Sequence, residues 1–138
     1  MLRPTILDDF GLDAGIRWLA ERFAERTGIA ADYRSNFHER LKDETETHLF
    51  RIVQEALTNV ARHSGAKHVG IELERNGDRI HLRMKDDGHG FQDERPEGLG
   101  LVGMRARARS VGGELQVQSK DGVAIDLWAP LAEATRDR

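Results

Sequence analysis

Three stretches of the sequence could together bind a phosphate-bearing ligand, and the first is a polar stripe on a helix. Glu55, Asn59 and Arg62 are spaced i, i+4 and i+7, which places them along one side of a helix. A carboxylate, an amide oxygen and a cation there could hold a Mg²⁺–phosphate group, because Mg²⁺ takes one or two protein oxygens and completes its shell with phosphate and water. The alternative, which spacing alone favours, is an ordinary solvated flank.

The second stretch is Asp86-Asp87-Gly88-His89-Gly90, which follows an alternating apolar segment at residues 80–84. Alternation with period two predicts that Asp86 continues on the inward face of a strand. An ionised carboxylate there is costly unless hydrogen-bond donors satisfy it. Asp86 could meet the amino group and ring nitrogen of a purine, with Gly88 and Gly90 allowing close backbone approach to a flat ligand. It could also be a loop residue that turns outward as the strand ends.

The third stretch is Gly98-Leu99-Gly100-Leu101-Val102-Gly103, directly before a helical pattern. A glycine-rich turn at a helix N-terminus presents free N–H groups and a positive dipole end to an anion. Glycines also occur at ordinary helix caps, so this pattern is weak by itself. It lacks the Gly-Lys-Ser/Thr of a P-loop. The following Arg105, Arg107 and Arg109 are spread around the helix, as on a solvated basic face, with contact to phosphate or to a partner as the alternative.

The elements that must position these residues follow from periodicity. Apolar spacing predicts three helices, and alternation predicts two hairpins with Asn76-Gly77 and Asp121-Gly122 turns. A capping box, Asp43 with Glu46, is expected to open the second helix. The chain is expected to begin with an irregular segment 1–11, followed by a helix from an Asp13 N-cap to Thr27 that Gly28 ends. A weak edge strand within 29–37 and a helix from 43 to about 63–65 come next. Strands around 69–73 and 80–84, a loop 86–100, a helix 101–111 and strands around 115–117 and 123–127 complete the order.

This order predicts an α+β fold, a two-layer sandwich with a mixed, mostly antiparallel sheet of about five strands covered on one face by three helices. The 138 residues suit one domain, for which we expect the bounds 1–131, with 132–138 as a frayed tail. Zero cysteines exclude a disulfide scaffold and a thiolate metal site, and a net charge of −3 implies no general nucleic-acid-binding surface. No apolar run approaches the roughly 20 residues of a membrane span, so we expect a cytoplasmic domain.

Taken in order, the three stretches resemble the Bergerat ATP-binding fold shared by gyrase, the heat-shock chaperone, histidine kinases and mismatch-repair proteins. The resemblance is closest to the catalytic domain of histidine kinases of the nitrate-sensor and membrane-fluidity-sensor type. Residues 49–63 look like the N box, 86–91 like the first glycine box and 98–107 like the second. The opening Leu2-Arg3-Pro4, Leu7-Asp8-Asp9 and Gly11-Leu12 also resemble the lead-in segment of that subgroup.

The resemblance implies a role for each matching residue. Asp86 would accept a hydrogen bond from the adenine amino group, and Asn59 would hold Mg²⁺ and through it the phosphates. Glu55, where better-known histidine kinases carry Asn, would assist Mg²⁺ or polarise the attacking group. Val102 replaces the last glycine of Gly-x-Gly-x-Gly, and only residues 91–97 remain for a short ATP lid. The pocket would be shaped by Gly88 and Gly90, and the phosphates would be contacted by Arg62, His63, Lys67 and the backbone of Gly98, Gly100 and Leu101.

The implied activity is transfer of the γ-phosphoryl of Mg-ATP to a histidine on a dimerisation domain that would precede residue 1. A response regulator receiver domain would be the downstream partner, and no nucleic acid is implied. The isolated chain is expected to be monomeric and unable to phosphorylate itself. Two alternatives remain: an ATP-hydrolysing or serine-phosphorylating member of the same fold, as in anti-sigma kinases, and an interaction module that no longer uses ATP.

Overall fold

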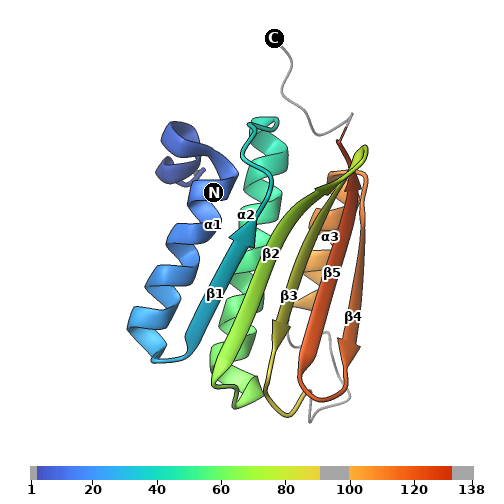
Figure 1. The fold of residues 1–138 in the computed structure, drawn as a ribbon. Helices are drawn as coiled ribbons and strands as arrows, with labels where there is room; N and C mark the ends of the chain where they lie inside the picture. The colour runs from blue at the N-terminus through green and yellow to red at the C-terminus, as the bar shows by residue number, and fades with distance from the viewer. Residues whose placement is uncertain (1–2, 91–99, 132–138) are drawn as a thin grey trace.

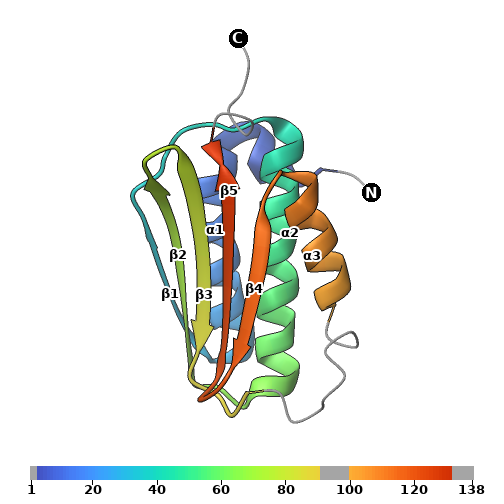
Figure 2. The same ribbon diagram turned by 90° about the vertical axis from the view of Figure 1, so that its right-hand side faces the viewer.

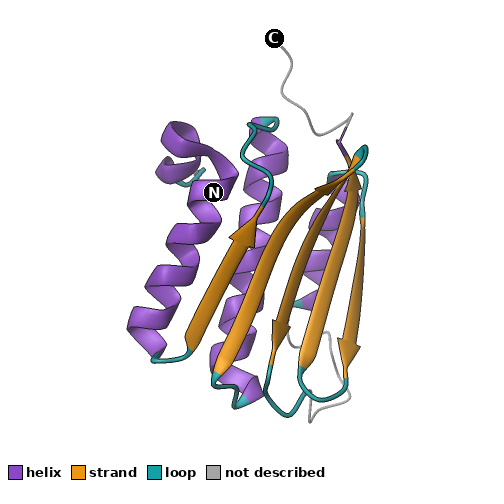
Figure 3. Ribbon diagram, viewed as in Figure 1, coloured by secondary structure: helices purple, strands orange, loops and turns teal. Residues whose placement is uncertain are grey.

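Helices cover one face of a five-stranded sheet in the computed structural model, which describes residues 3–90 and 100–131 (Figures 1 and 2). Figure 3 shows the two layers, with helices in purple and strands in orange. This arrangement confirms the predicted α+β sandwich. The elements in chain order are α1 (Thr5–Thr27), β1 (Ala30–Ser35), α2 (Asp43–Asn59), η1 (Val60–Ser64), β2 (His68–Asn76), β3 (Arg79–Asp86), α3 (Leu101–Ser110), β4 (Glu114–Ser119) and β5 (Val123–Pro130).

The sheet is mixed, with strand order β1-β2-β3-β5-β4. β1 pairs with β2 in parallel, and the other neighbouring pairs are antiparallel. The parallel pair is possible because α2 carries the chain across the sheet between the two strands. Register places Val69 of β2 opposite Asp86 of β3, so the two residues share the inward face at the end of the sheet where β3 finishes.

The core lies between α2 and the inward face of the sheet. Leu49, Ile52, Val53 and Ala56 recur at helical spacing and are all buried. The opposing strand residues alternate, so that every second side chain is buried, as in the pattern of β3 that ends with Asp86. Helical spacing in α2 and alternation in the strands therefore place their apolar residues in one core.

The lead-in segment differs from the prediction, because residues 5–10 are helical rather than irregular. Leu7 is completely buried, and its side chain packs beside Gly15. The helix is interrupted only at Gly11, whose φ of 85° suits glycine. Asp13 is not the N-cap of α1; its carboxylate accepts a hydrogen bond from the Tyr33 hydroxyl at 2.6 Å instead. The tertiary burial of Leu7 explains why local patterning missed this helix start.

The start of α2 also corrects the prediction. Lys42 is the N-cap residue, without a side-chain capping bond, and Asp43 lies in the first turn. Glu46 does reach back, but to the backbone N–H of Leu41 at 3.1 Å. The predicted C-terminal end is confirmed, since α2 continues as one π-helical turn, η1, and stops at the left-handed Gly65.

Two predictions, the frayed tail 132–138 and the short lid 91–97, fall on residues outside those that the structure describes. Within the described ranges, no helix combines the length and the hydropathy that a membrane crossing requires.

Candidate functional site

Asp86, the last residue of β3, is a buried carboxylate at the end of the sheet. Only 4% of its surface is exposed, which confirms the predicted inward orientation. Its Oδ1 accepts the backbone N–H groups of Gly88 at 2.8 Å and Val123 at 3.3 Å. Among the described residues, Oδ2 accepts no such bond and is not fully enclosed. Two backbone donors thus stabilise the carboxylate while one oxygen stays available to a ligand.

A largely apolar pocket, part of it open to solvent, lies beside Asp86. One wall comes from α2 and η1, and the other comes from β2, β3 and β5. An apolar slot with a few polar groups at its edge suits a flat heteroaromatic ring with an amino group. The lining residues are Ala56, Asn59, Val60, Ser64, Val69, Met84, Lys85, Asp86, Gly90, Val123 and Ile125.

The glycines after Asp86 are required by the packing of the protein itself. A Cβ at Gly88 would overlap the backbone oxygen of Ser64. Gly90 has a φ of 79°, and a Cβ there would lie 2.7 Å from the Ser119 hydroxyl. The backbone N–H of His89 also donates to the Ser64 oxygen at 3.0 Å. These glycines allow the loop to pack against η1 and against the end of β4, and Gly90 lines the pocket.

Asp87 has a different role from its neighbour. Its side chain is exposed, and Oδ1 accepts the backbone N–H groups of Lys67 at 2.8 Å and His68 at 3.0 Å. These hydrogen bonds lower the pKa of the Asp87 carboxyl below its ordinary value. Lys67 enters this contact through its backbone only; its exposed side chain is not part of the pocket wall. Asp87 therefore fixes the start of β2, while Asp86 faces the pocket.

The three residues of the predicted polar stripe, Glu55, Asn59 and Arg62, have different surroundings in the structure. Asn59 lines the same pocket as Asp86. Glu55 is half-buried, and its carboxylate touches the place that a Cβ of Gly100 would occupy. Arg62 belongs to η1 and is exposed, outside the pocket wall. The structure thus brings Asn59 to Asp86 and brings Glu55 to the glycine turn.

The glycine turn ends as predicted at a helix N-terminus. Gly100 is the N-cap residue of α3, with a φ of 75° and no side-chain capping bond, and Leu101 is the first helical residue. The first N–H groups of such a helix have no intrahelical acceptor and suit an anion. Leu101 is buried, which fixes the direction of this turn. Gly98 and the side chain of His63 lie outside what the structure describes.

Oxygen donors in this region suit a hard divalent cation. Asn59 and Glu55 supply an amide and a carboxylate from one helix face, which are ligand types that Mg²⁺ accepts. Over residues 3–90 and 100–131, no cluster of three or more acidic or histidine side chains could enclose a metal. A cation bound here would therefore take its remaining ligands from phosphate and water.

Two parts of the pocket were not predicted. Lys85 lines it although alternation directs its side chain outward; its position next to Asp86 at the end of the strand was the available signal. β5 also lines it through Val123, and the β4–β5 turn before Val123 packs against the end of β3, since a Cβ at Gly122, where φ is 101°, would overlap the backbone oxygen of Asp86. The turn itself was predicted from Asp121-Gly122, but its contact with β3 depends on strand order, which local pattern does not encode.

Known proteins share this arrangement. Residues 44–133 match the family model described as histidine kinase-, DNA gyrase B-, and HSP90-like ATPase. The oxygen sensor histidine kinase NreB of Staphylococcus carnosus (strain TM300) is 37% identical over 138 residues, which cover 96% of this chain and 40% of that protein. The histidine-protein kinase/phosphatase DegS of Brevibacillus brevis is 38% identical over 135 residues, covering 94% and 35% respectively. The chain therefore spans less than half the length of these relatives.

Solved structures agree on the fold. The histidine kinase domain of the blue-light activated histidine kinase EL346 of Erythrobacter litoralis superposes with a TM-score of 0.77 at 21% identity, covering 94% of this chain and 70% of that one. The mycobacterial sensor histidine kinase MprB gives a TM-score of 0.67 at 21% identity, with 90% and 95% covered. With the family match over most of its length, the chain belongs to the histidine kinase-, DNA gyrase B- and HSP90-like ATPase family.

Proposed function

We propose that this domain binds Mg-ATP and is the catalytic ATP-binding part of a sensor histidine kinase. The observation that carries the proposal is the buried Asp86, whose Oδ1 is held by two backbone N–H groups while Oδ2 is left for a ligand at the edge of an apolar pocket. The match of residues 44–133 to the ATPase family supports ATP as that ligand.

The adenine ring would occupy the apolar pocket. Asp86 is an acceptor when ionised, so it would accept a hydrogen bond from the adenine amino group. Met84 and Ile125 would contact one face of the ring, since both line the same wall of the pocket from adjacent strands. Gly88 and Gly90 would shape its mouth, because their close contacts with Ser64 and Ser119 leave no room for side chains.

The phosphates would extend from the pocket toward α3. Asn59 would hold Mg²⁺, with Glu55 as a second ligand or as the group that polarises the attacking atom. Bound Mg²⁺ would neutralise part of the phosphate charge, and positioning would supply most of the remaining catalysis. Arg62, His63 and Lys67 would add positive charge. Backbone N–H groups of Gly98, Gly100 and Leu101 would complete the phosphate site at the start of α3.

The reaction would transfer the γ-phosphoryl group to a histidine nitrogen on a dimerisation domain. The bond between the γ-phosphorus and the β–γ bridging oxygen breaks, a phosphorus–nitrogen bond forms, and ADP leaves. A response regulator receiver domain would then accept the group. The names of the relatives, all sensor or signal-transduction histidine kinases, support this scheme. The 138-residue chain alone would be monomeric and would not phosphorylate itself.

Calorimetric titration with a non-hydrolysable ATP analogue and Mg²⁺ tests the nucleotide site. Asp86→Asn should weaken binding by about one to two orders of magnitude, since a charged hydrogen bond to the ligand is worth roughly 1.5–3 kcal/mol. Asp87→Asn is the matched control, because it removes the adjacent carboxylate outside the pocket, and should bind like the wild type. Absence of binding to the folded wild-type chain, or equal loss in both variants, would refute the proposal.

A second activity, ATP hydrolysis without a protein acceptor, has one residue in its favour. Glu55 is a carboxylate at the position where gyrase and chaperone members carry a residue that activates water. A phosphate-release assay on the wild type and on Glu55→Gln separates the two activities. Steady release that Glu55→Gln abolishes would favour hydrolysis, and negligible release in both proteins would favour the kinase.

A further inference from the structure

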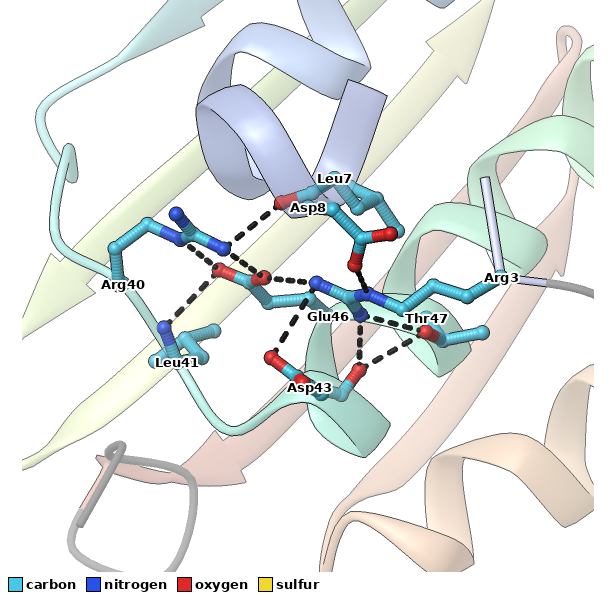
Figure 4. Close-up of polar contacts among 8 residues, drawn as sticks. All are labelled: Arg3, Leu7, Asp8, Arg40, Leu41, Asp43, Glu46 and Thr47. Atoms are coloured by element: carbon cyan, nitrogen blue, oxygen red, sulfur yellow. Dashed lines mark hydrogen bonds and ion pairs between the residues drawn. The ribbon is translucent and has the colours of Figure 1, made fainter. Parts of the chain in front are cut away.

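A buried carboxylate is held between two arginines at the end of α2 opposite to the pocket (Figure 4). Glu46, in the first turn of α2, has no exposed surface. It accepts hydrogen bonds from Arg40 Nε at 3.1 Å, from Arg3 Nη2 at 2.8 Å and from the backbone N–H of Leu41 at 3.1 Å. Arg3 lies before α1 and Arg40 lies before α2, so one carboxylate joins two separate segments of the chain.

Arg40 belongs firmly to the body of the domain. Besides Glu46, its Nη2 donates to the backbone oxygen of Leu7 at 2.8 Å. Its side chain also covers Gly11, where a Cβ would lie 2.6 Å from Arg40 Cδ. Moving Arg40 would therefore disturb α1 at its kink and remove the backbone contact near buried Leu7. This half of the network is part of the core.

Arg3 makes contacts of another kind. Figure 4 shows its guanidinium reaching Asp8, Thr47 and the backbone oxygen of Asp43 in addition to Glu46. The side chains of Asp8 and Asp43 are 52% and 62% exposed, so water can solvate them once Arg3 leaves. Burial lowers the pKa of Arg3, but the hydrogen bonds to Glu46 and Asp8 outweigh it and raise that pKa, so Arg3 is charged throughout.

The two arginines are unequal in what their removal leaves behind. Loss of the sole partner of a buried charge is strongly destabilising, because that charge is left uncompensated. If Arg3 leaves, Glu46 keeps Arg40 and the Leu41 N–H, so the buried charge stays paired. If Arg40 leaves, Leu7 and Gly11 also lose their contact.

We propose that Arg3 is a releasable tie between the chain that enters the domain and the first turn of α2, with Arg40 holding Glu46 in both the tied and the released state. In the tied state the start of the chain is fixed against the helix that carries Asn59 at its other end. In the released state this segment moves while the core stays folded. The tie therefore sets whether the start of the chain moves with α2 or independently of it.

Amide hydrogen exchange on the full chain tests the tie and requires no nucleotide, so its outcome is independent of the nucleotide proposal. Arg3→Ala should speed exchange within residues 3–10 by about tenfold or more, whereas exchange in residues 49–57 of α2 should stay within about twofold of the wild type. Arg40→Ala is the matched comparison, because it removes the other guanidinium from the same carboxylate. Arg40→Ala should speed exchange in both segments and should lower the melting temperature more than Arg3→Ala does.

Two results would overturn the inference. One is an Arg3→Ala variant whose α2 exchanges as fast as that of Arg40→Ala; the other is unchanged exchange in residues 3–10. If Arg40→Ala does not fold, Glu46→Gln replaces it, since Gln keeps an acceptor for the Leu41 N–H. Combining Glu46→Gln with Arg3→Ala should then speed exchange in residues 3–10 no more than Arg3→Ala alone, and additive effects would contradict a shared tie.

Discussion

The backbone of Gly100 lies against the carboxylate of Glu55, so closely that a Cβ at position 100 would overlap it. This contact joins the N-terminus of α3 to the middle of α2. The glycine turn and the polar helix stripe, which are 45 residues apart in the sequence, are therefore parts of one surface. A ligand that spans from Asp86 toward α3 would pass the helix face that carries Asn59 and Glu55.

Gly100→Ala should destabilise the protein and displace the start of α3. The φ of 75° costs a non-glycine residue about 1–2 kcal/mol, and the added methyl group displaces the Glu55 carboxylate. Gly103→Ala is the matched control, because nothing lies within 4 Å of the added atom in the interior of the same helix. It should stabilise the protein by up to about 1 kcal/mol. Urea unfolding measures both, and equal effects would refute the role given to Gly100.

Strand alternation and helical spacing in the sequence correctly predicted which way side chains face. Alternation in β3 was enough to place Asp86 on the inward face, and helical spacing was enough to place Asn59 beside the core of α2. The sequence did not reveal the Val123 N–H that donates to Asp86, because that donor comes from β5, and the strand order β3-β5-β4 brings it there. The lead-in helix was missed for the same reason, since burial of Leu7 is a tertiary effect.

Glu46 shows how a residue in a capping-box pattern can take a different role from the predicted one. Its spacing after Asp43 resembles a capping box, and it does bond to a backbone N–H just before the helix. Arg3, 43 residues earlier, and Arg40 convert it into a buried ion-pair network. No sequence period connects Arg3 to Glu46, so only the fold reveals their pairing.

Asn59 and Asp86 line the same pocket, yet their loss should have different consequences. Asn59→Ala should remove most of the gain in affinity that Mg²⁺ gives to an ATP analogue, because a metal ligand acts only through the metal. Asp86→Asn should weaken binding to a similar extent with and without Mg²⁺, since it would contact the base. Titrations of both variants with the cation and with a chelator measure this difference. An Asn59→Ala variant with unchanged Mg²⁺ dependence would exclude Asn59 as a ligand.

Tyr33→Phe should lower the free energy of unfolding by about 1 kcal/mol, the usual contribution of one hydrogen bond. The Tyr33 hydroxyl donates to Asp13 Oδ1 at 2.6 Å and joins β1 to α1. Burial opposes ionisation of Asp13, but hydrogen bonds from Tyr33 and His38 and the nearby Arg17 outweigh it and lower its pKa. The variant should therefore also raise the pKa of Asp13. Nuclear magnetic resonance titration of that carboxyl tests this; an unchanged pKa would contradict it.

Asp87 should make folding stability depend on pH in acid. Backbone N–H groups of Lys67 and His68 lower its pKa in the folded state below the ordinary value of about 3.9. A lowered folded-state pKa means that the unfolded chain binds the proton more tightly. The stabilisation is therefore complete above the unfolded-state pKa and is lost as the pH falls through the folded-state pKa.

Asp87→Asn removes the charge of this side chain but keeps an acceptor for both N–H groups. In urea unfolding, the difference in stability between wild type and Asp87→Asn should be constant between about pH 7 and pH 5 and should shrink below about pH 4. A difference that persists unchanged to about pH 2 would show that the charge of Asp87 does not hold the start of β2, and that its acceptor oxygen alone does.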